Sequence, residues 1–221
     1  GLQYQQEENY YAALKHYFKA LEFYETVKSE NSLHLYQNIS SAYLNLNTPD
    51  KAAKYAKDGV ALAEESWVPV NIKLQAFSTL ASVYLQNNNT IDARIYLDKI
   101  RPYMPDTVEQ AVTSDYYLDR GLLYFKEQRY DSSSRYYSTG YKFATVTKHQ
   151  INQYGALNYL FKNALKLGNM KQAAHYANEG MKVAAQTGMA INMITALHNL
   201  SDYHHAAGNE KKAFEFLQHG T

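Results

Sequence analysis

Apolar and small residues follow a helical spacing along the whole chain. After Ala52, further small residues come four and then seven positions later, at Ala56 and Gly59, so the three share one face of an α-helix. The same spacing follows Ala173. No segment shows the strict alternation of a half-buried strand. The pattern therefore predicts an all-α protein.

These helical segments recur at a nearly constant interval. The small residue that opens the pattern, which we name the repeat position, is found at Ala13, Ala52, Ala93, Ser133, Ala173 and Ala213. The intervals are 39, 41, 40, 40 and 40 residues. One structural unit of about 40 residues, copied end to end, is the signature of a solenoid. We name the helix that carries the repeat position helix B.

A second helix, helix A, is expected before each helix B. Nine residues before the repeat position stand Tyr4, Tyr43, Tyr84, Tyr124, Ala164 and His204. Small, aliphatic and aromatic residues precede these tyrosines at helical spacing, as Tyr36 and Ser40 precede Tyr43. Each unit is therefore expected to be a helical hairpin.

Turn residues separate the expected helices. Asn47 tolerates a left-handed backbone, Thr48 is a candidate N-cap, and Pro49 suits the first helical position. Residues 87–90, 168–169 and 208–209 occupy the equivalent places, while residues 67–69, 102–105 and 186–188 break the pattern between units. The units expected are about 1–29, 30–68, 69–106, 107–148, 149–188 and 189–221.

The residues of helices A and B resemble those of the tetratricopeptide repeat (TPR) family. Units two and three carry the likeness best, through Tyr36, Ile39, Ser40, Tyr43, Ala52, Ala56 and Gly59, and through Phe77, Leu80, Ala81, Tyr84, Ala93 and Pro105. The period is longer than the standard one of about 34 residues. The resemblance implies a right-handed α-α superhelix of about six antiparallel hairpins. Long-period repeats of this kind are similar to the sensor and scaffold regions of bacterial transcription regulators and signalling proteins.

We expect one elongated domain over residues 1–221, because neighbouring hairpins of a solenoid share a continuous core. The first unit lacks the upstream half of its helix A, the last helix B stops at Thr221, and the chain does not begin with methionine. We therefore expect an excerpt of a longer protein, with incomplete terminal repeats and with flanking domains as possible partners.

Composition and motifs narrow the class of function. The chain has no cysteine, which excludes disulfides and thiol chemistry and fits either the cytoplasm or an exported, periplasmic compartment. No apolar run approaches the roughly 18 residues that span a membrane. The phosphate-binding, dinucleotide-binding and hydrolase motifs are missing, so we expect no enzyme and no cofactor. The net charge of +1 without an arginine-rich stripe argues against direct nucleic-acid binding.

In TPR proteins the A helices line an inner surface that recognises partners. Projecting that arrangement onto this chain gives ten candidate contact residues: Gln37, Ser41, Asn45, Ser78, Ser82, Phe125, Lys126, Asn158, Lys162 and Lys166. Gln37 and Ser41 stand where the family's clamp for chaperone tails would start with lysine and asparagine, so that mode is not implied.

Charge is distributed unevenly along the chain. Residues 1–119 carry a net charge of −5 and residues 120–182 one of +7. We expect Lys126, Lys162 and Lys166, with Phe125 nearby, to receive an acidic or C-terminal carboxylate group of a bound peptide. The alternative, that these lysines are ordinary solvated residues of exposed helices, remains open.

Two further possibilities concern metal binding and self-association. His198, Asp202 and His205 share one face of the last helix A, but they span two turns, which is too far for a compact metal site. We expect a hydrogen-bonded polar face there and no metal. A structural role, in which the chain self-associates and binds no separate ligand, is the alternative to peptide binding, and a homodimer is possible in either case.

Overall fold

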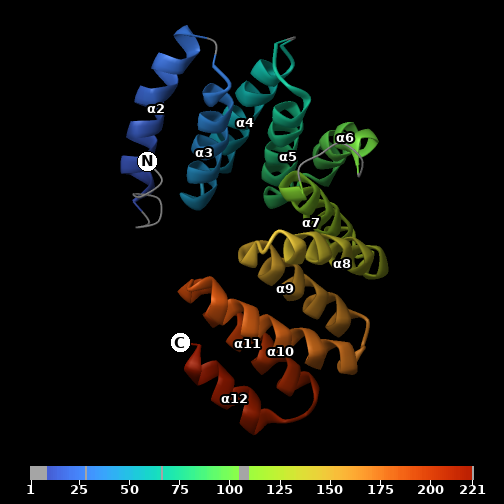
Figure 1. Cartoon of the computed structure of the whole chain (residues 1–221). Helices are drawn as coiled ribbons and strands as arrows, with labels where there is room; N and C mark the ends of the chain where they lie inside the picture. Colours follow the sequence, from blue (N-terminus) through green and yellow to red (C-terminus); the bar gives the residue numbers. More distant parts are fainter. Residues whose placement is uncertain (1–8, 28, 66, 105–109, 221) are drawn as a thin grey trace. The chain divides into compact units, whose positions relative to one another are not determined.

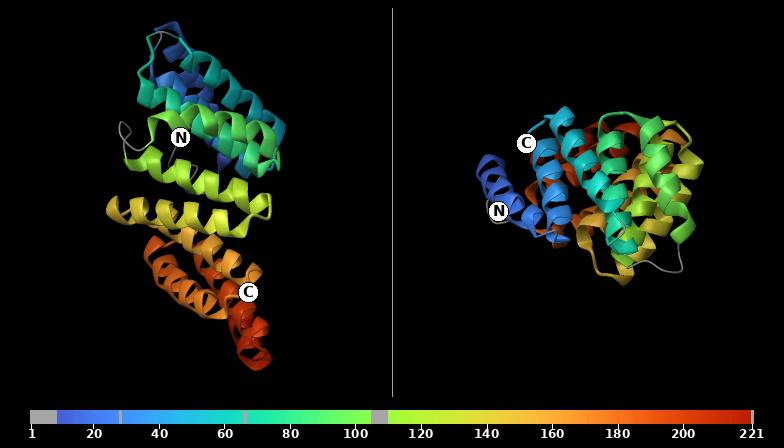
Figure 2. Two further views of the ribbon diagram at one scale, coloured as in Figure 1. Left: turned by 90° about the vertical axis from the view of Figure 1, so that its right-hand side faces the viewer. Right: turned by 90° about the horizontal axis from the view of Figure 1, so that it is seen from above.

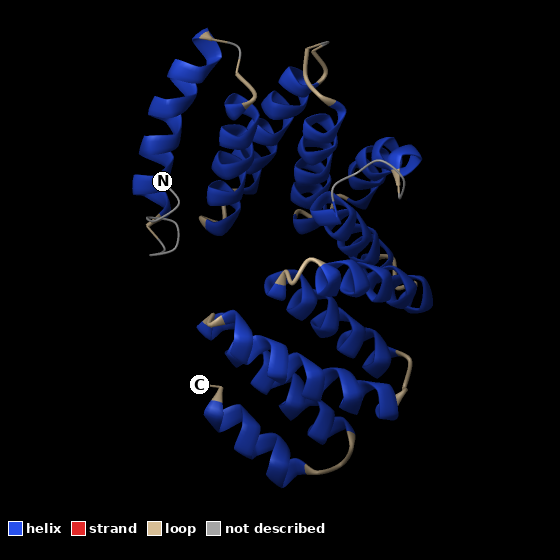
Figure 3. Cartoon of the chain, in the orientation of Figure 1, coloured by secondary structure: helices blue, strands red, loops and turns tan. Residues whose placement is uncertain are grey.

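The computed structural model describes residues 9–27, 29–65, 67–104 and 110–220. The expected first helix A, around Tyr4, and the expected break at Pro105 lie outside these residues. Within them every regular element is helical and no strand occurs (Figure 3). No helix in the described part of the chain is long and apolar enough to cross a membrane. The chain divides into two compact units, Gly1–Val108 and Glu109–Thr221.

Unit 1 contains α2 (Tyr10–Thr26), α3 (Asn31–Asn45), α4 (Pro49–Ala63), α5 (Val70–Gln86), α6 (Thr90–Ile100) and a 3-10 turn (Arg101–Tyr103). Unit 2 contains α7 (Gln110–Lys126), α8 (Tyr130–Val146), α9 (Gln150–Lys166), α10 (Met170–Thr187), α11 (Ala190–Ala206) and α12 (Glu210–His219). Within each unit consecutive helices pack against each other in antiparallel pairs (Figures 1 and 2). Helices α3, α5, α7, α9 and α11 are A helices, and α2, α4, α6, α8, α10 and α12 are B helices. The predicted all-α, TPR-like hairpin fold is confirmed.

The repeat position is buried in all six described B helices. Its residues are Ala13, Ala52, Ala93, Ser133, Ala173 and Ala213. A small side chain at such a position lets a neighbouring helix lie close. The interval read from the sequence therefore marks a buried position that recurs from one B helix to the next.

A serine hydroxyl ties helix A to helix B in three hairpins. Ser40 Oγ donates to the carbonyl of Ala52 at 2.9 Å, and Ser201 Oγ makes the equivalent bond to the carbonyl of Ala213 at 2.7 Å. In the α7–α8 hairpin the serine lies on helix B instead. There Ser133, at the repeat position, donates to the carbonyl of Gly121 on helix A at 2.9 Å. The bond joins the same two levels of the helices in all three cases.

Many of the tyrosines are packing residues. The aromatic residue nine positions before the repeat position stacks on one three positions after it, in the pairs Tyr43–Tyr55, Tyr84–Tyr96, Tyr124–Tyr136 and His204–Phe216. Ring centroids in these pairs are 5.4, 6.0, 5.1 and 5.4 Å apart. Contacts of this length are favourable between offset rings. The repeated tyrosine of helix A therefore packs against helix B of its own hairpin.

The turns between helices A and B share one backbone geometry. A residue with positive φ follows each A helix, at Asn47, Asn88, Gln128, Gly168 and Gly208. The side chains of Asn89, Asn169 and Asn209 then accept a backbone N–H three residues later and cap the B helix. Thr48 holds the N-cap position of α4, as predicted, but its side chain makes no capping bond, and its hydroxyl donates to the carbonyl of Tyr43.

Candidate functional site

The A helices of unit 2 form a continuous row. Helix α9 contacts both α7 and α11 directly. Two side-chain interactions show which face of α9 points toward α11. Asn199 Nδ2 donates to Asn158 Oδ1 at 2.9 Å, and the charge of Asp202 raises the pKa of Lys162 against the effect of burial. The face that carries the sequence candidates of α9 therefore joins the equivalent face of α11.

Lys162 is the most constrained of the candidate lysines. Its side chain is partly buried, and Nζ lies 5.0 Å from the centroid of the Tyr159 ring. Burial lowers the pKa of the Lys162 ammonium, while the nearby carboxylate of Asp202 opposes this change. A partly desolvated cation over an aromatic face interacts more strongly with an anion than a fully hydrated one does. Lys162 therefore has the electrostatic setting of a binding group.

The other two lysines extend this setting along the A helices. Lys166 follows Lys162 by one turn of α9 and is exposed, and Lys126 ends α7 and is partly buried. We refer to Lys126, Lys162 and Lys166 as the lysine row.

Phe125 is primarily a packing residue. Its ring meets Tyr130 edge to face at 5.6 Å and Tyr159 at 5.1 Å. Tyr159 in turn stacks on the buried ring of Tyr137, with centroids 4.9 Å apart and an interplanar angle of 3°. This aromatic cluster joins α7, α8 and α9 and holds Tyr159 beneath the Lys162 ammonium. Only the partly exposed edge of Phe125 is left for a ligand.

The candidate residues of unit 1 form a neutral set on α3 and α5, which contact each other directly. Ser78 is buried, and Gln37 places its Nε2 in the interior, where no hydrogen-bond acceptor of the described residues reaches it. Asn45 donates to the carbonyl of Ser41 at 2.9 Å. Ser41, Ser82 and Asn45 are partly or fully exposed, so unit 1 offers small neutral contacts where unit 2 offers cations.

The charge of Asp202 raises the pKa of Lys162, an effect that the possible metal set of His198, Asp202 and His205 does not predict. His205 Nδ1 contacts the carboxylate of Glu210 at 2.9 Å. Across the described ranges no group of three or more metal-ligating side chains comes together. The repeat offered a signal, because Asp202 stands 40 residues after Lys162 and so occupies the same place on the next A helix.

The tetratricopeptide repeat profile matches residues 33–66, which form the second hairpin. No curated protein matches the chain. Among solved structures, a STAND signal-transduction ATPase with a tetratricopeptide repeat sensor from Pyrococcus horikoshii has a TM-score of 0.70 at 17% identity. That match covers 86% of this chain and 29% of the archaeal one, so the chain spans under a third of that protein.

Two further structures show the same fold. A putative kinesin light chain with nearly identical TPR-like repeats from Podosopora anserina has a TM-score of 0.67 at 14% identity, over 87% of this chain and 94% of the other. Aspartyl phosphate phosphatase F from Bacillus subtilis has a TM-score of 0.69 at 15% identity, over 100% of this chain and 67% of the other. The chain thus carries a tetratricopeptide repeat at residues 33–66 and has the fold of tetratricopeptide repeat proteins.

Proposed function

We propose that this chain is a protein-interaction module that binds an acidic peptide segment along the A helices of unit 2. The observation that carries the proposal is the partly buried ammonium of Lys162, set over Tyr159 on the face shared by α9 and α11. Carboxylates pair with such a cation through charge-assisted hydrogen bonds. We assign the chain no catalytic role.

The charge of Asp202 affects how a ligand carboxylate binds at Lys162. Burial lowers the pKa of Lys162 and the charge of Asp202 opposes this change, so Asp202 also adds a like charge near a ligand carboxylate at that lysine. The positive segment 120–182, with its net charge of +7, favours the approach of acidic chains at low ionic strength. Binding that weakens as salt is added is therefore part of the proposal.

The solved structures of similar fold suggest a setting for such a module. One belongs to a signal-transduction ATPase with a tetratricopeptide repeat sensor and another to an aspartyl phosphate phosphatase. With these similarities as support, we propose that the chain is the sensory or scaffold region of a larger bacterial signalling protein or transcription regulator, where flanking domains of the same protein can also be its partners.

Charge reversal of the lysine row tests the proposal. Acidic peptides from a display selection are expected to bind the unmodified chain, and replacing Lys126, Lys162 and Lys166 with glutamate is expected to weaken that binding at least about tenfold. Affinity is measured by fluorescence anisotropy with a labelled peptide.

The matched control reverses three exposed lysines on B helices, Lys142, Lys171 and Lys211, with the same change in net charge. It is expected to retain peptide binding within about threefold. Equal losses in the two triple variants would show that binding depends on net charge alone, and an absence of acidic peptides from the selection would also contradict the proposal.

A second candidate function, self-association, is favoured by the surface of α12. The residue four positions after the repeat position is 5% exposed or less in each of the other five B helices, but its equivalent in α12, Leu217, is 44% exposed. Phe214, on the same helix, is 60% exposed. In α2, α4, α8 and α10 the following A helix packs against the B helix. The apolar face of α12 is therefore suited to receive another helix.

Replacing Phe214 and Leu217 with glutamate is expected to convert any dimer of the chain into monomers. Two ionised side chains in an apolar contact introduce charges that would have to lose their hydration there. Mass is measured by light scattering across a range of protein concentrations. The control replaces Ile91 and Ile95, two exposed residues of α6, with glutamate. A monomeric unmodified chain at all concentrations would remove this candidate.

A further inference from the structure

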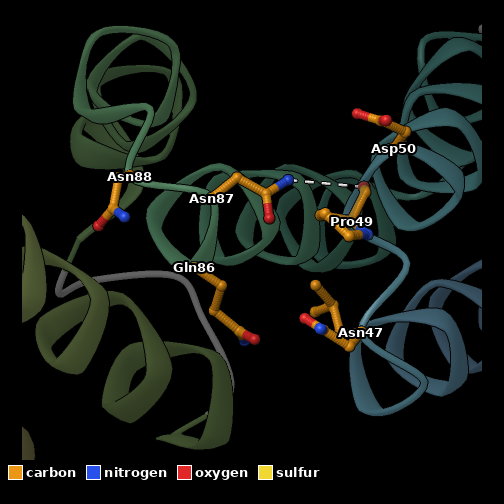
Figure 4. Close-up of a pocket in the computed structure, with 7 residues that line it drawn as sticks. Asn47, Pro49, Asp50, Gln86, Asn87 and Asn88 are labelled. Atoms are coloured by element: carbon orange, nitrogen blue, oxygen red, sulfur yellow. Dashed lines mark hydrogen bonds between the residues drawn. The ribbon is translucent and has the colours of Figure 1, made fainter.

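A polar cavity lies where the α3–α4 and α5–α6 hairpins turn (Figure 4). Its volume is about 430 Å³, and its lining residues are Leu44, Asn47, Pro49, Asp50, Gln86, Asn87 and Asn88. All of them belong to unit 1. The volume falls within the range of about 300–1,000 Å³ typical of ligand pockets. We refer to this cavity as the turn pocket.

The turn pocket carries one formal charge, and it is negative. Asp50 is its only ionisable lining residue. The nearest cation in the chain sequence, Lys51, holds its ammonium 5.4 Å from the centroid of the Tyr43 ring. Unit 1 as a whole has 10 Lys and Arg against 12 Asp and Glu. The charge of the pocket and of its unit therefore favours a cationic ligand.

Carboxamides supply most of the remaining polar atoms. Asn87 Nδ2 donates to the carbonyl of Pro49 at 3.5 Å and so leaves its Oδ1 as an acceptor (Figure 4). The side chains of Asn47 and Gln86 extend toward the space between the two hairpins (Figure 4). Asn47 and Asn88 have left-handed backbone conformations, with φ of 52° and 58°, and this sets the direction of their Cα–Cβ bonds. The pocket therefore presents amide oxygens from both hairpins and one carboxylate.

We propose that the turn pocket binds the guanidinium group of an arginine side chain from a partner peptide. A guanidinium is planar, permanently charged and has five N–H donors without an acceptor, so it matches a set of carboxylate and amide oxygens. A carboxylate ligand would meet Asp50 with like charge, and an apolar ligand would gain nothing from the Asp50 charge. This site lies in unit 1 and does not depend on the lysine row of unit 2.

The test uses N-acetyl-arginine methylamide as the probe and its citrulline analogue as a neutral probe of nearly the same shape. Each is titrated into the isotope-labelled 221-residue chain, and amide resonances are followed by NMR. The arginine probe is expected to shift resonances of Asn47, Gln86, Asn87 and Asn88, and to bind at least about fivefold more tightly than the citrulline probe. Equal affinities, or no shifts at these residues, would overturn the proposal.

Two variants show whether Asp50 is the group that selects the charge. Asp50→Asn is expected to weaken binding of the arginine probe about fivefold, because it removes the carboxylate and keeps the shape. Asp131→Asn is the matched control: Asp131 occupies the same place in the first turn of α8, two residues before the repeat position, so it makes the same change in charge outside the pocket. The Asp131→Asn variant is expected to bind the arginine probe as tightly as the unmodified chain does.

A third variant tests the proposal through a gain of binding, which a partly unfolded chain could not produce. Gln86→Glu adds a carboxylate to the pocket and is expected to tighten binding of the arginine probe severalfold, with no gain for the citrulline probe. Weaker or unchanged arginine binding by Gln86→Glu, in a chain whose NMR spectrum remains dispersed, would contradict the proposal. These outcomes are independent of the acidic-peptide experiment, so either proposal can fail alone.

Discussion

Replacing Gly121 with valine is expected to lower the free energy of unfolding by about 3 kcal/mol, near the upper end for overpacking a core. A Cβ at Gly121 would lie 2.7–2.8 Å from Cδ2, Cε2 and Cγ of the Tyr137 ring. That ring cannot easily move aside, because it is buried and stacks on Tyr159 with centroids 4.9 Å apart. The side chain added to α7 therefore has to separate α7 from α8.

Chemical denaturation of the variant measures this effect. Gly155→Ala in α9 is the control, since a Cβ there would meet nothing within 4 Å and alanine favours a helix over glycine by about 0.5–1 kcal/mol. The control is expected to be as stable as the unmodified chain or slightly more so. A Gly121→Val variant of unchanged stability would show that the α7–α8 contact is looser than described.

Replacing Ser133 with alanine is expected to lower the free energy of unfolding by about 2 kcal/mol, although alanine is the residue that the other five units carry at this position. The Ser133 hydroxyl donates to the carbonyl of Gly121 and accepts from Asn163 Nδ2, with both distances 2.9 Å. Asn163 is fully buried. Without the hydroxyl, its amide nitrogen loses that acceptor in the core.

A second substitution is expected to recover much of this loss. The place of Asn163 is taken by the aliphatic residues Val83 and Leu123 in hairpins three and four, so the double variant Ser133→Ala, Asn163→Val restores an apolar pair. Removing both polar partners leaves no amide without its partner. A double-mutant cycle in denaturant is expected to give a coupling of at least about 1 kcal/mol. Additive losses would show that the two side chains do not depend on each other.

The fold could be predicted from the sequence because the repeat position is a steric requirement. Small residues recur at a buried position of each B helix, and the interval alone located every described hairpin. Position in the repeat also predicts the backbone geometry of the turns better than residue type does. Gln128 adopts a φ of 60° although glutamine has no preference for it, and its place in the repeat is that of Asn47 and Asn88.

The candidate site was less predictable, because helical spacing gives the face of a residue but not its neighbours. Lys162 was placed on the correct helix, yet its contact with Tyr159 and the charge of Asp202 depend on how α9 packs against the helices beside it. Phe125 was expected to present its ring to a ligand, and most of that ring packs against Tyr130 and Tyr159. Helical spacing alone could not distinguish a side chain that packs against its neighbours from one that is available to a ligand.

Mapping a bound acidic peptide by NMR on the isotope-labelled chain shows whether the peptide lies on the A helices of unit 2. The largest shifts are expected there, around Lys126 in α7, Asn158 and Lys162 in α9, and Asp202 in α11. These shifts are expected to diminish as salt is added. Shifts concentrated on the B helices α8, α10 and α12, or spread evenly over both units, would contradict the proposal.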